Sequence, residues 1–594
     1  MDRIVGWLGA RRAPWLVIAI GIALAAPALT ADFTADDHLH RVVERADPGI
    51  AGLHARPLDL FVFATGDPAD TIQLRDGGLF PWWVDPSLRL AFFRPLSSAT
   101  HALDHALWPD SAVAQLAHNL LWHALALLIA WLFFRRFLPG RERWLAVLAL
   151  ALFAFDDARG PVVGWIANRN ALVALVLAVP VLLAHDRWRR DGWARGRVVA
   201  PLLFAVALGA GESALAILAY VAAHALWLDR ARWRDRAIAL APYLAIVIGW
   251  RIVYAHLGYG VAGSGIYLDP GADPLAFLTA AATRLPFLLA GQLALPWSDF
   301  ASFYAVLGVT AVMLAIAFAL LVAIGLACAR LLRRDPAARF FATGMLLAAI
   351  PVASTFPADR LLTFTSLGAM GLVAQLIGAA LCRRELLGDR KPRRIAAASI
   401  AYLLVLLHLV LAPPFLVLRS RSMVAVARVL DRADASIPAT TGRTVIIAAT
   451  PSDALVGYVP IMRASRGQPC PAHLYWLATS TTPVTLERLD ERTLRVTPEQ
   501  GFLRYELDQM TRSARQRPFS VGDRIPLTGL TIEIESVTAD RRPASVLAHF
   551  TTPLDDPSRI WLRWQGHGYV PYTPPAIGHR ETLPAVDFGT LLDE

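Results

Sequence analysis

Two adjacent acids, Asp36 and Asp37, stand directly after the first apolar stretch of the chain. That stretch, Trp15 to Leu29, is nearly long enough to cross a bilayer. A carboxylate just beyond a membrane exit keeps its charge but is poorly solvated, which suits a general base or a metal ligand. The plainer interpretation is a polar stop that fixes the helix end at the interface. Charged residues further along the chain help to decide between a catalytic role and a polar stop.

Further acids and arginines occur at the turns of later apolar hairpins. They lie on the side that faces away from the arginine-rich loops: Arg94, Asp156, Asp157, Arg169, Glu212 and Arg360. Acids suit an acceptor-activating base or a metal, and the planar fork of arginine suits a phosphate. Taken singly, each arginine is also compatible with a snorkelling interface anchor. Taken together, these residues predict one cavity with both signs of charge that opens away from the cytoplasm.

Composition indicates that most of the chain lies in a bilayer. Of the 594 residues, 56% are hydrophobic, and the mean hydropathy is +0.46. A water-soluble protein cannot bury that much apolar surface. The net charge of +10 comes from arginines in short clusters between apolar runs, which is the pattern of cytoplasmic loops. We therefore expect membrane lipids as partners and no nucleic acid.

The arginine clusters also predict the topology. If each cluster is cytoplasmic, the apolar runs between them predict about eleven transmembrane helices, with the N-terminus inside. The basic start and the small residues at 26–28 also fit a cleavable secretory signal, and in either case Asp36 and Asp37 lie outside. A last outward crossing at Ala396 to Leu418 places the C-terminal part outside the cytoplasm.

Three regions are predicted from these features. A transmembrane domain covers 1–418 and includes a first extracytoplasmic loop at 32–110. A linker covers 419–440. The region 441–594 has strand-like alternation and β-branched content, which predicts an extracytoplasmic β-rich domain, a small sandwich or barrel.

Aromatic and apolar stretches outside the predicted spans carry two finer expectations. The segments 80–83 (Phe-Pro-Trp-Trp) and 92–95 (Phe-Phe-Arg-Pro) suit short helices whose aromatic rings lie at headgroup level. The apolar run Pro274 to Leu295 suits a re-entrant or surface hairpin.

Several short motifs occur in the order and spacing of a known family. They are Ala35-Asp36-Asp37-His38, Phe93-Arg94-Pro95-Leu96, the segment Leu116 to His123, Gly164 to Asn170, Gly211 to Leu215, and Ala358-Asp359-Arg360-Leu361-Leu362. Over roughly residues 10 to 415 the chain resembles the membrane part of GT-C class glycosyltransferases. It is most similar to the protein O-mannosyltransferase-like group, whose bacterial and animal members carry tetratricopeptide repeats; here the β-rich tail stands in their place.

The resemblance implies a polyprenyl-phosphate-linked sugar donor and transfer with inversion on the extracytoplasmic face. It places the catalytic acid at Asp36 or Asp37, and a second acid near Asp156 or Asp157. Related proteins usually show a His-Pro and a Glu before the Trp-Ile segment, and the departure here puts that second acid in question. The implied location is a bacterial inner membrane, with the C-terminal domain periplasmic.

We expect Arg169 and Arg360 to neutralise the donor phosphate as the glycosidic bond breaks. Arg94 is a third phosphate-binding candidate and would orient these groups with Glu212, the remaining member of the second acidic site. The expected partner is an unknown protein or glycan acceptor, but the sequence does not reveal whether the acceptor is a protein, a glycan or a lipid. It also does not reveal the sugar or the length of the donor lipid chain.

A divalent metal held by Asp36, Asp37 and His38 is left open, although adjacent residues rarely converge on one ion. His118 and Asn119 lie on a mostly apolar helix, where hydrogen bonding between helices is the more common role.

Two other classes of function remain as alternatives. A membrane transporter or flippase would line both halves of the bilayer and often shows inverted repeats, whereas here the polar residues favour one face. A non-enzymatic envelope-assembly subunit would bind a partner through its tail. Such a subunit would keep its activity when the first-loop acids are replaced.

Overall fold

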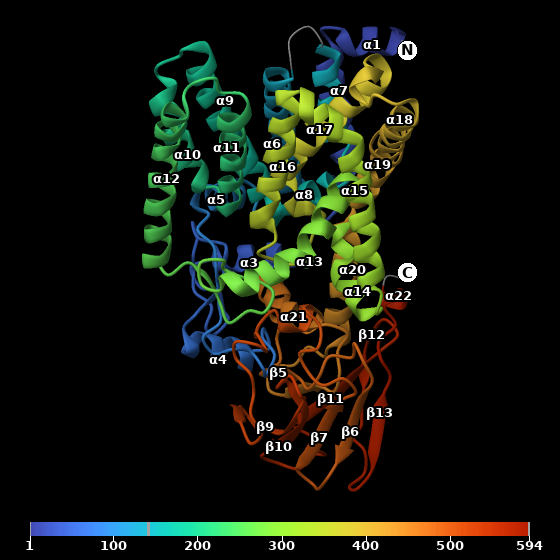
Figure 1. The fold of residues 1–594 in the computed structure, drawn as a ribbon. Helices are drawn as coiled ribbons and strands as arrows, with labels where there is room; N and C mark the ends of the chain where they lie inside the picture. Colours follow the sequence, from blue (N-terminus) through green and yellow to red (C-terminus); the bar gives the residue numbers. More distant parts are fainter. Residues whose placement is uncertain (1, 139–142, 592–594) are drawn as a thin grey trace. The chain divides into compact units, whose positions relative to one another are not determined.

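The computed structural model describes residues 2–138 and 143–591 (Figure 1). The chain divides into two compact units. The helical unit holds the chain up to Asp32, Phe93–Leu257 and Asp273–Met423. The mixed unit holds Phe33–Phe92, Gly258–Ala272 and the chain from Val424 onward.

The helical unit is built from α-helices joined by short 3-10 turns. The α-helices are α1 (Asp2–Gly9), α2 (Ala13–Ala25), α5 (Pro95–Leu107), α6 (Ala112–Phe137), α7 (Arg143–Ala154), α8 (Arg159–Gly164), α9 (Asn170–Asp191), α10 (Gly196–Leu208), α11 (Ile217–Trp227), α12 (Trp233–His256), α13 (Pro274–Leu293), α14 (Ala301–Val306), α15 (Thr310–Arg334), α16 (Pro336–Val352), α17 (Thr363–Cys382), α18 (Lys391–Val405) and α19 (Ala412–Arg419). The 3-10 turns are η1 (Ala26–Thr30), η2 (Ile166–Arg169), η3 (Glu212–Ala216), η4 (Ser298–Phe300), η5 (Asp359–Leu361) and η6 (Arg384–Leu386), and a π-helix, η7 (Leu406–Leu411), joins α18 to α19.

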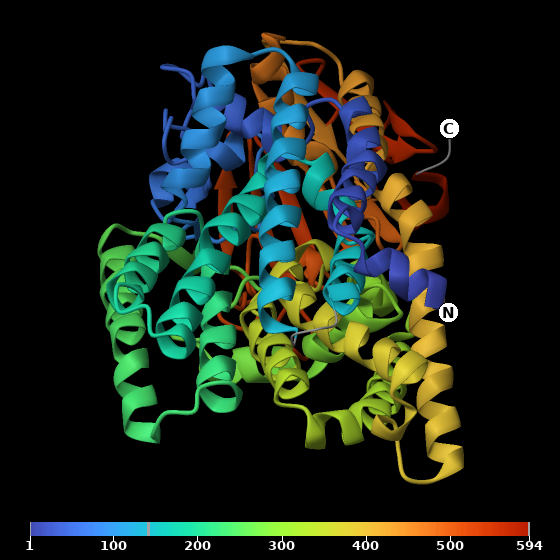
Figure 2. The same cartoon turned by 90° about the horizontal axis from the view of Figure 1, so that it is seen from above.

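The core of this unit forms around α6 and α17. In Figure 2, α6 is the light-blue helix, and it packs against α2, α7, α8 and α9. In the 18-residue apolar segment of α17, 94% of the residues are buried, as expected for a helix that is hydrophobic all round. Phe133 and Phe134 of α6 meet Phe341 of α16, and Tyr220 of α11 packs edge-on against Phe133.

Other helices expose their apolar side chains. Only 17% of the apolar window of α12 and 22% of that of α15 are buried, so residues such as Ile252 and Leu326 are exposed. Exposed apolar helix faces of this kind would drive association in water, whereas lipid accommodates them. Among the described residues, eight helices are long and apolar enough to cross a membrane, and four shorter apolar helices accompany them. The protein is therefore a helical integral membrane protein, while the count of about eleven spans stays a prediction.

The expected hairpin at 274–295 is wrong, because α13 runs through it as one continuous helix. Asp273 caps the helix by accepting a hydrogen bond from Ala276 N at 2.9 Å, and Pro274 occupies the first turn. A proline in the first turn costs no hydrogen bond, and its fixed φ favours helix initiation.

The mixed unit contains short helices and three sheets. Its helices are α3 (Asp36–Val43), α4 (Pro68–Asp76), α20 (Ser422–Ser436), α21 (Asp453–Arg466) and α22 (Phe588–Leu591), with a 3-10 turn η8 (Leu507–Gln509). Its strands are β1 (Val62–Thr65), β2 (Arg89–Ala91), β3 (Gly260–Ala262), β4 (Thr444–Ile447), β5 (His473–Trp476), β6 (Val484–Arg488), β7 (Thr493–Pro498), β8 (Arg524–Leu527), β9 (Leu530–Val537), β10 (Pro543–Phe550), β11 (Arg559–Gln565), β12 (Gly568–Pro571) and β13 (Arg580–Leu583).

The C-terminal region is β-rich, as predicted, but one of its sheets is not antiparallel. Strands β13-β6-β7-β10-β9-β8 form an antiparallel sheet. In the second sheet, β12-β11-β4-β5, strand β4 is parallel to both β5 and β11, and α21 is the crossover from β4 to β5. The predicted all-β sandwich or barrel is wrong at this point, because a parallel pair needs a long crossover, and here it is a helix.

The boundaries of the two compact units differ from the predicted domain boundaries. Part of the first loop packs with the C-terminal part: Val42 and Phe61 share a buried cluster with Ile461. The predicted linker at 419–440 is also occupied by α20.

The expectation of a short interfacial helix at 80–83 is wrong. This segment is not helical, and Trp82 and Trp83 are 3% and 2% exposed. Both rings contact Phe502, and the Trp82 indole donates to Leu477 O at 3.0 Å. In the second stretch, Pro95 begins α5. The aromatic side chains at 82 and 83 are therefore buried within the mixed unit.

Candidate functional site

Asp36 and Asp37 form the first turn of α3, where the helix dipole favours negative charge. Asp37 is buried, and its Oδ2 accepts from Thr34 N at 3.0 Å. Asp36 is half-buried, and its Oδ1 accepts from the Tyr458 hydroxyl at 2.6 Å. The residue before them, Ala35, has φ +53°, in a region that costs non-glycine residues free energy and recurs at functional sites.

His38 points to a different partner from the two acids. Its Nδ1 lies 2.6 Å from Ser465 Oγ. Burial, and then the positive charges of Arg466 and Arg41, lower the pKa of His38 to about 3, so the ring is neutral. Within residues 2–138 and 143–591, no group of three or more His, Cys, Asp or Glu side chains is placed to hold a metal ion.

In the helical unit, three carboxylates gather on one arginine that the sequence did not single out. Arg419 Nη1 donates to Asp157 Oδ2 at 2.6 Å and lies 3.1 Å from Asp359 Oδ2, while Nη2 pairs with Asp299. Burial and the neighbouring Asp156 raise the pKa of Asp157. Burial and the neighbouring Asp299 raise the pKa of Asp359 to about 7. The Asp359 carboxyl therefore stays protonated at pH values where an aspartate is usually ionised.

Two glycines allow the cluster to form. A Cβ on Gly160 would lie 2.6 Å from the Arg419 carbonyl carbon, and one on Gly164 would lie 2.2 Å from Ser420 O. Any larger residue would push α8 away from the end of α19. The approach brings the turn that carries Asp157 against Arg419.

Asp156, next in sequence, faces into protein. Its Oδ2 accepts from Ser366 Oγ at 3.0 Å and from Gln292 Nε2 at 3.2 Å, and its Oδ1 accepts from Ala158 N at 3.2 Å. The two neighbouring acids therefore have separate partners.

Arg360 lies on η5, between α16 and α17. Its guanidinium carbon lies 5.0 Å from the centre of the Trp165 ring and 5.7 Å from that of Phe356. The side chain is half-buried. Among the described residues it has no carboxylate partner within salt-bridge distance. This leaves a cation on an aromatic shelf with donors to spare.

Arg169 has the opposite surroundings. It is fully buried and pairs with the buried Asp104. Its Nε donates to Asn119 Oδ1 at 2.5 Å, Nη1 to Thr100 O at 3.1 Å and Nη2 to Gln115 O at 3.0 Å. The Asn119 amide in turn donates to Val163 O at 3.1 Å, which fixes α6 against the turn before Arg169.

His118 belongs to the same network. Its Nδ1 lies 2.6 Å from Asp104 Oδ1, and its Nε2 accepts from the Trp122 indole at 3.0 Å. His118 and Asn119 therefore both act as hydrogen-bonding residues.

Arg94 and Glu212 meet, although they come from distant hairpins. Arg94 Nε donates to Glu212 Oε2 at 2.9 Å, and the Tyr254 hydroxyl donates to Oε1 at 3.1 Å. With its amide oriented to satisfy both neighbours, Asn170 accepts from Arg94 Nη1 at 3.2 Å. Gly211, with φ +152°, supplies a backbone turn that side chains rarely adopt.

The predicted residues of the helical unit thus fall into neighbouring small groups. The turn at Asp157 and the turn at Asp359 and Arg360 meet through Arg419. Asp104, Asp299, Arg419 and Tyr458 are not among the predicted residues. Asp104 carried no signal beyond being an acid before a span, and Arg419 follows an apolar run where a cytoplasmic-style anchor is the usual interpretation.

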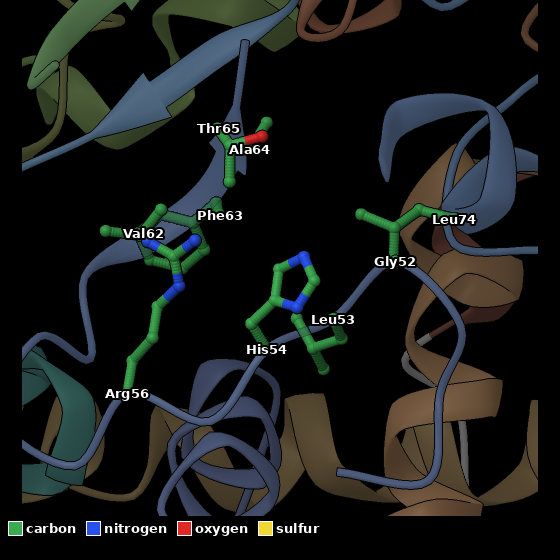
Figure 3. Close-up of a pocket in the computed structure, with 9 residues that line it drawn as sticks. All are labelled: Gly52, Leu53, His54, Arg56, Val62, Phe63, Ala64, Thr65 and Leu74. Carbon is green, nitrogen blue, oxygen red and sulfur yellow. The ribbon is translucent and has the colours of Figure 1, made fainter. Parts of the chain in front are cut away.

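A small pocket in the mixed unit lies on β1 and the loop before it (Figure 3). It contains about 230 Å³ of empty space, part of it open to solvent. Its lining residues are Gly52, Leu53, His54, Arg56, Val62, Phe63, Ala64, Thr65 and Leu74. None of the predicted site residues lines it.

No protein-family model and no curated protein matches the chain. Among solved structures it is similar to ArnT from Cupriavidus metallidurans bound to undecaprenyl phosphate, with 14% identity, 78% of this chain and 86% of that chain covered, and a TM-score of 0.35. For ArnT from the same organism in the apo state the identity is 13%, the coverage 77% and 84%, and the TM-score 0.33. TM-scores this low carry no conclusion about the fold, ligand or activity of this chain.

Proposed function

We propose that the protein is a GT-C type glycosyltransferase that moves a sugar from a polyprenyl-phosphate-linked donor to an acceptor on the extracytoplasmic face, with inversion. The observation that carries the proposal is the Arg360 guanidinium, which has no carboxylate partner among the described residues. Arg360 lies on the turn that joins two apolar helices, α16 and α17. If both helices cross the membrane, such a turn would lie near the lipid headgroups.

An unpaired, half-buried guanidinium fits a phosphate better than a structural role. Arginine presents a planar fork that matches phosphate oxygens, and the Trp165 ring holds the fork from one side. Negative charge builds up on the leaving phosphate as the glycosidic bond breaks, and a fixed cation stabilises that charge. The Phe356 ring, whose centre lies 5.7 Å from the guanidinium carbon, adds an apolar surface suited to a lipid chain.

Asp36 and Asp37 would supply the base. The acceptor oxygen attacks C1 of the sugar, the bond from C1 to the phosphate oxygen breaks, and polyprenyl phosphate leaves with the electron pair. The acceptor proton passes to the carboxylate, which the N-terminus of α3 favours in its ionised form. A single displacement of this kind inverts the configuration at C1.

The other predicted residues would act by holding these groups. Arg94 and Glu212 tie α5 to η3, and Arg169 ties η2 to α6 through Asn119. Asp157 and Asp359 fix the turn beside Arg360 through Arg419. The contacts of Arg169 favour such a positioning role over direct binding of the phosphate.

The finer parts of the proposal follow the sequence resemblance. They are membership of the O-mannosyltransferase-like group, a bacterial inner membrane, a cytoplasmic N-terminus and a periplasmic C-terminal part. The acceptor is then a protein or glycan of the envelope, and a divalent metal stays an open cofactor.

Mass analysis of envelope glycans and glycoproteins, in cells with and without the gene, tests the proposal. Restoring the wild-type gene should restore one sugar addition, and the variant carrying Asp36→Asn and Asp37→Asn should not, although it reaches the membrane. The matched control is the pair Asp555→Asn and Asp556→Asn, adjacent acids of a loop in the same unit. Full sugar addition by the Asp36 and Asp37 variant would refute the assignment of the base.

A further inference from the structure

The C-terminal part of the chain reaches the first-loop acids through one helix. Within the mixed unit, α21 packs against α3. Leu39 and Val43 of α3 and Ile461 of α21 belong to one buried apolar cluster. Because α21 is also the crossover between β4 and β5, its position is fixed by the parallel sheet.

Polar contacts fix the end of α21 on the first loop. Arg45 donates to Ala464 O at 2.8 Å and to Ser465 O at 2.7 Å, two of the last carbonyls of the helix. A cation at a helix C-terminus satisfies carbonyls that have no partner within the helix, and it also complements the helix dipole. The Ser465 hydroxyl lies 2.6 Å from His38 Nδ1, which adds a second link to α3.

In the middle of α21, Tyr458 contacts the proposed base. Its hydroxyl donates to Asp36 Oδ1 at 2.6 Å, since an ionised carboxylate can only accept. The charged and titratable groups around it are Asp36 and Asp37 of α3 and Tyr267 of the segment 258–272. Burial and the Asp36 charge raise the pKa of Tyr458 well above its ordinary value, so the hydroxyl stays protonated.

We propose that Tyr458 is a positioning residue for Asp36, so that the C-terminal β-rich part of the chain belongs to the catalytic machinery instead of being an appended module. The inference rests on the proposed function. Tyr458 fixes one oxygen of the carboxylate and, as a donor to its ionised form, keeps that form favoured at lower pH. No pattern in the sequence links a tyrosine of the tail to an acid 422 residues earlier.

The test uses the full-length protein in lipid nanodiscs. A tritium-labelled polyprenyl-phosphate hexose is the donor, and envelope membranes from cells that lack the gene supply the acceptor. Initial transfer rates are measured from pH 5 to pH 9 for wild type, Tyr458→Phe and a matched control, Tyr569→Phe. Tyr569 is a buried tyrosine of the same unit whose hydroxyl lies 2.7 Å from Thr450 Oγ1.

Tyr458→Phe should lower kcat about tenfold, because a hydrogen bond to a charged group is lost. The acid limb of its pH profile should move to higher pH, because the carboxylate becomes more basic. KM for the donor should stay unchanged, and Tyr569→Phe should match wild type in rate and profile. A Tyr458→Phe enzyme with the same rate and pH profile as Tyr569→Phe overturns the inference and leaves the proposed function standing.

Two further outcomes are decisive. If Tyr458→Phe does not fold, a fluorinated tyrosine at position 458 keeps the side-chain shape and strengthens the donor, and it should move the acid limb to lower pH. An unchanged limb would overturn the inference. If wild type transfers no sugar from any polyprenyl-phosphate donor, the proposed function fails, and the role of Tyr458 fails with it.

Discussion

Arg169 and Arg360 were predicted to share one role, yet the structure gives them opposite surroundings. Arg169 is fully buried and donates to a side-chain amide and two backbone carbonyls while it pairs with Asp104. Arg360 is half-buried and rests on Trp165 and Phe356, and no described carboxylate lies within salt-bridge distance of it. Both belong to the helical unit and to turns between apolar helices.

The difference shows what separates a structural charge from a binding charge. A guanidinium has five N–H donors, and protein groups already engage every nitrogen of Arg169. A ligand would have to displace these partners and leave Asp104 buried without a cation. Arg360 would give up no described carboxylate partner when a phosphate binds. Unmet hydrogen-bonding capacity, and not charge alone, therefore identifies the candidate ligand group.

The largest expected effect comes from replacing Arg169, the fully buried arginine. Arg169→Gln leaves the buried Asp104 carboxylate without its arginine and with only His118 beside it among the described charged groups, and should lower the free energy of unfolding by about 3–5 kcal/mol. Thermal unfolding in detergent, followed by tryptophan fluorescence, measures the loss. Adding Asp104→Asn should recover part of the stability, because the uncompensated charge is gone. Equal stability of Arg169→Gln and wild type would show that this network is not structural.

The substitution Arg360→Gln tests the half-buried arginine as the phosphate-binding group. Losing the cation that faces the leaving phosphate should lower the transfer rate about 100- to 1,000-fold, while the unfolding temperature stays that of wild type. The rate is measured with a labelled polyprenyl-phosphate hexose in liposomes, and Arg333→Gln, on the exposed end of α15, is the control. Undiminished transfer would remove the observation on which the proposed function rests.

The Arg419 cluster lies between these extremes, and its protonation is testable. The pKa of Asp359 is near 3.8 in the unfolded chain and is raised to about 7 in the fold. The folded state then binds more protons than the unfolded state between those pH values, so stability should fall as pH rises from about 4 to 7. Asp359→Asn should remove this contribution. Relative to wild type, its unfolding temperature should rise between pH 5 and pH 8, and a constant difference would contradict the assignment.

The smallest expected effect concerns the aromatic shelf. Trp165→Leu keeps the backbone carbonyl that accepts from Asn119 but removes the ring under Arg360. A cation–π contact contributes about 0.5–2 kcal/mol, so KM for the donor should rise a few-fold to about tenfold with kcat little changed. Steady-state kinetics separate the two constants. A fall in kcat equal to that of Arg360→Gln would show that Trp165 does more than hold the guanidinium.

Much of the fold follows from local patterns. Apolar runs bounded by arginines predict helices such as α6 and α9, and alternation predicts strands such as β9 and β11. The errors have tertiary causes. The aromatic rings at Trp82 and Trp83 suit an interface equally well, but here Phe502 and other buried residues cover them.

The candidate site was predictable as a set of residues and not as a set of contacts. Composition and position alone placed acids and arginines at the turns between apolar helices. They also placed Asp36 and Asp37 immediately after the first apolar run, because hydropathy and charge are properties of short segments. Which charge meets which was decided only by the tertiary structure. Arg419 reaches Asp157 across 262 residues, and Tyr458 reaches Asp36 across 422. The physical reason is that a buried charge takes its nearest compensating partner in space, and packing, not sequence distance, determines which partner that is.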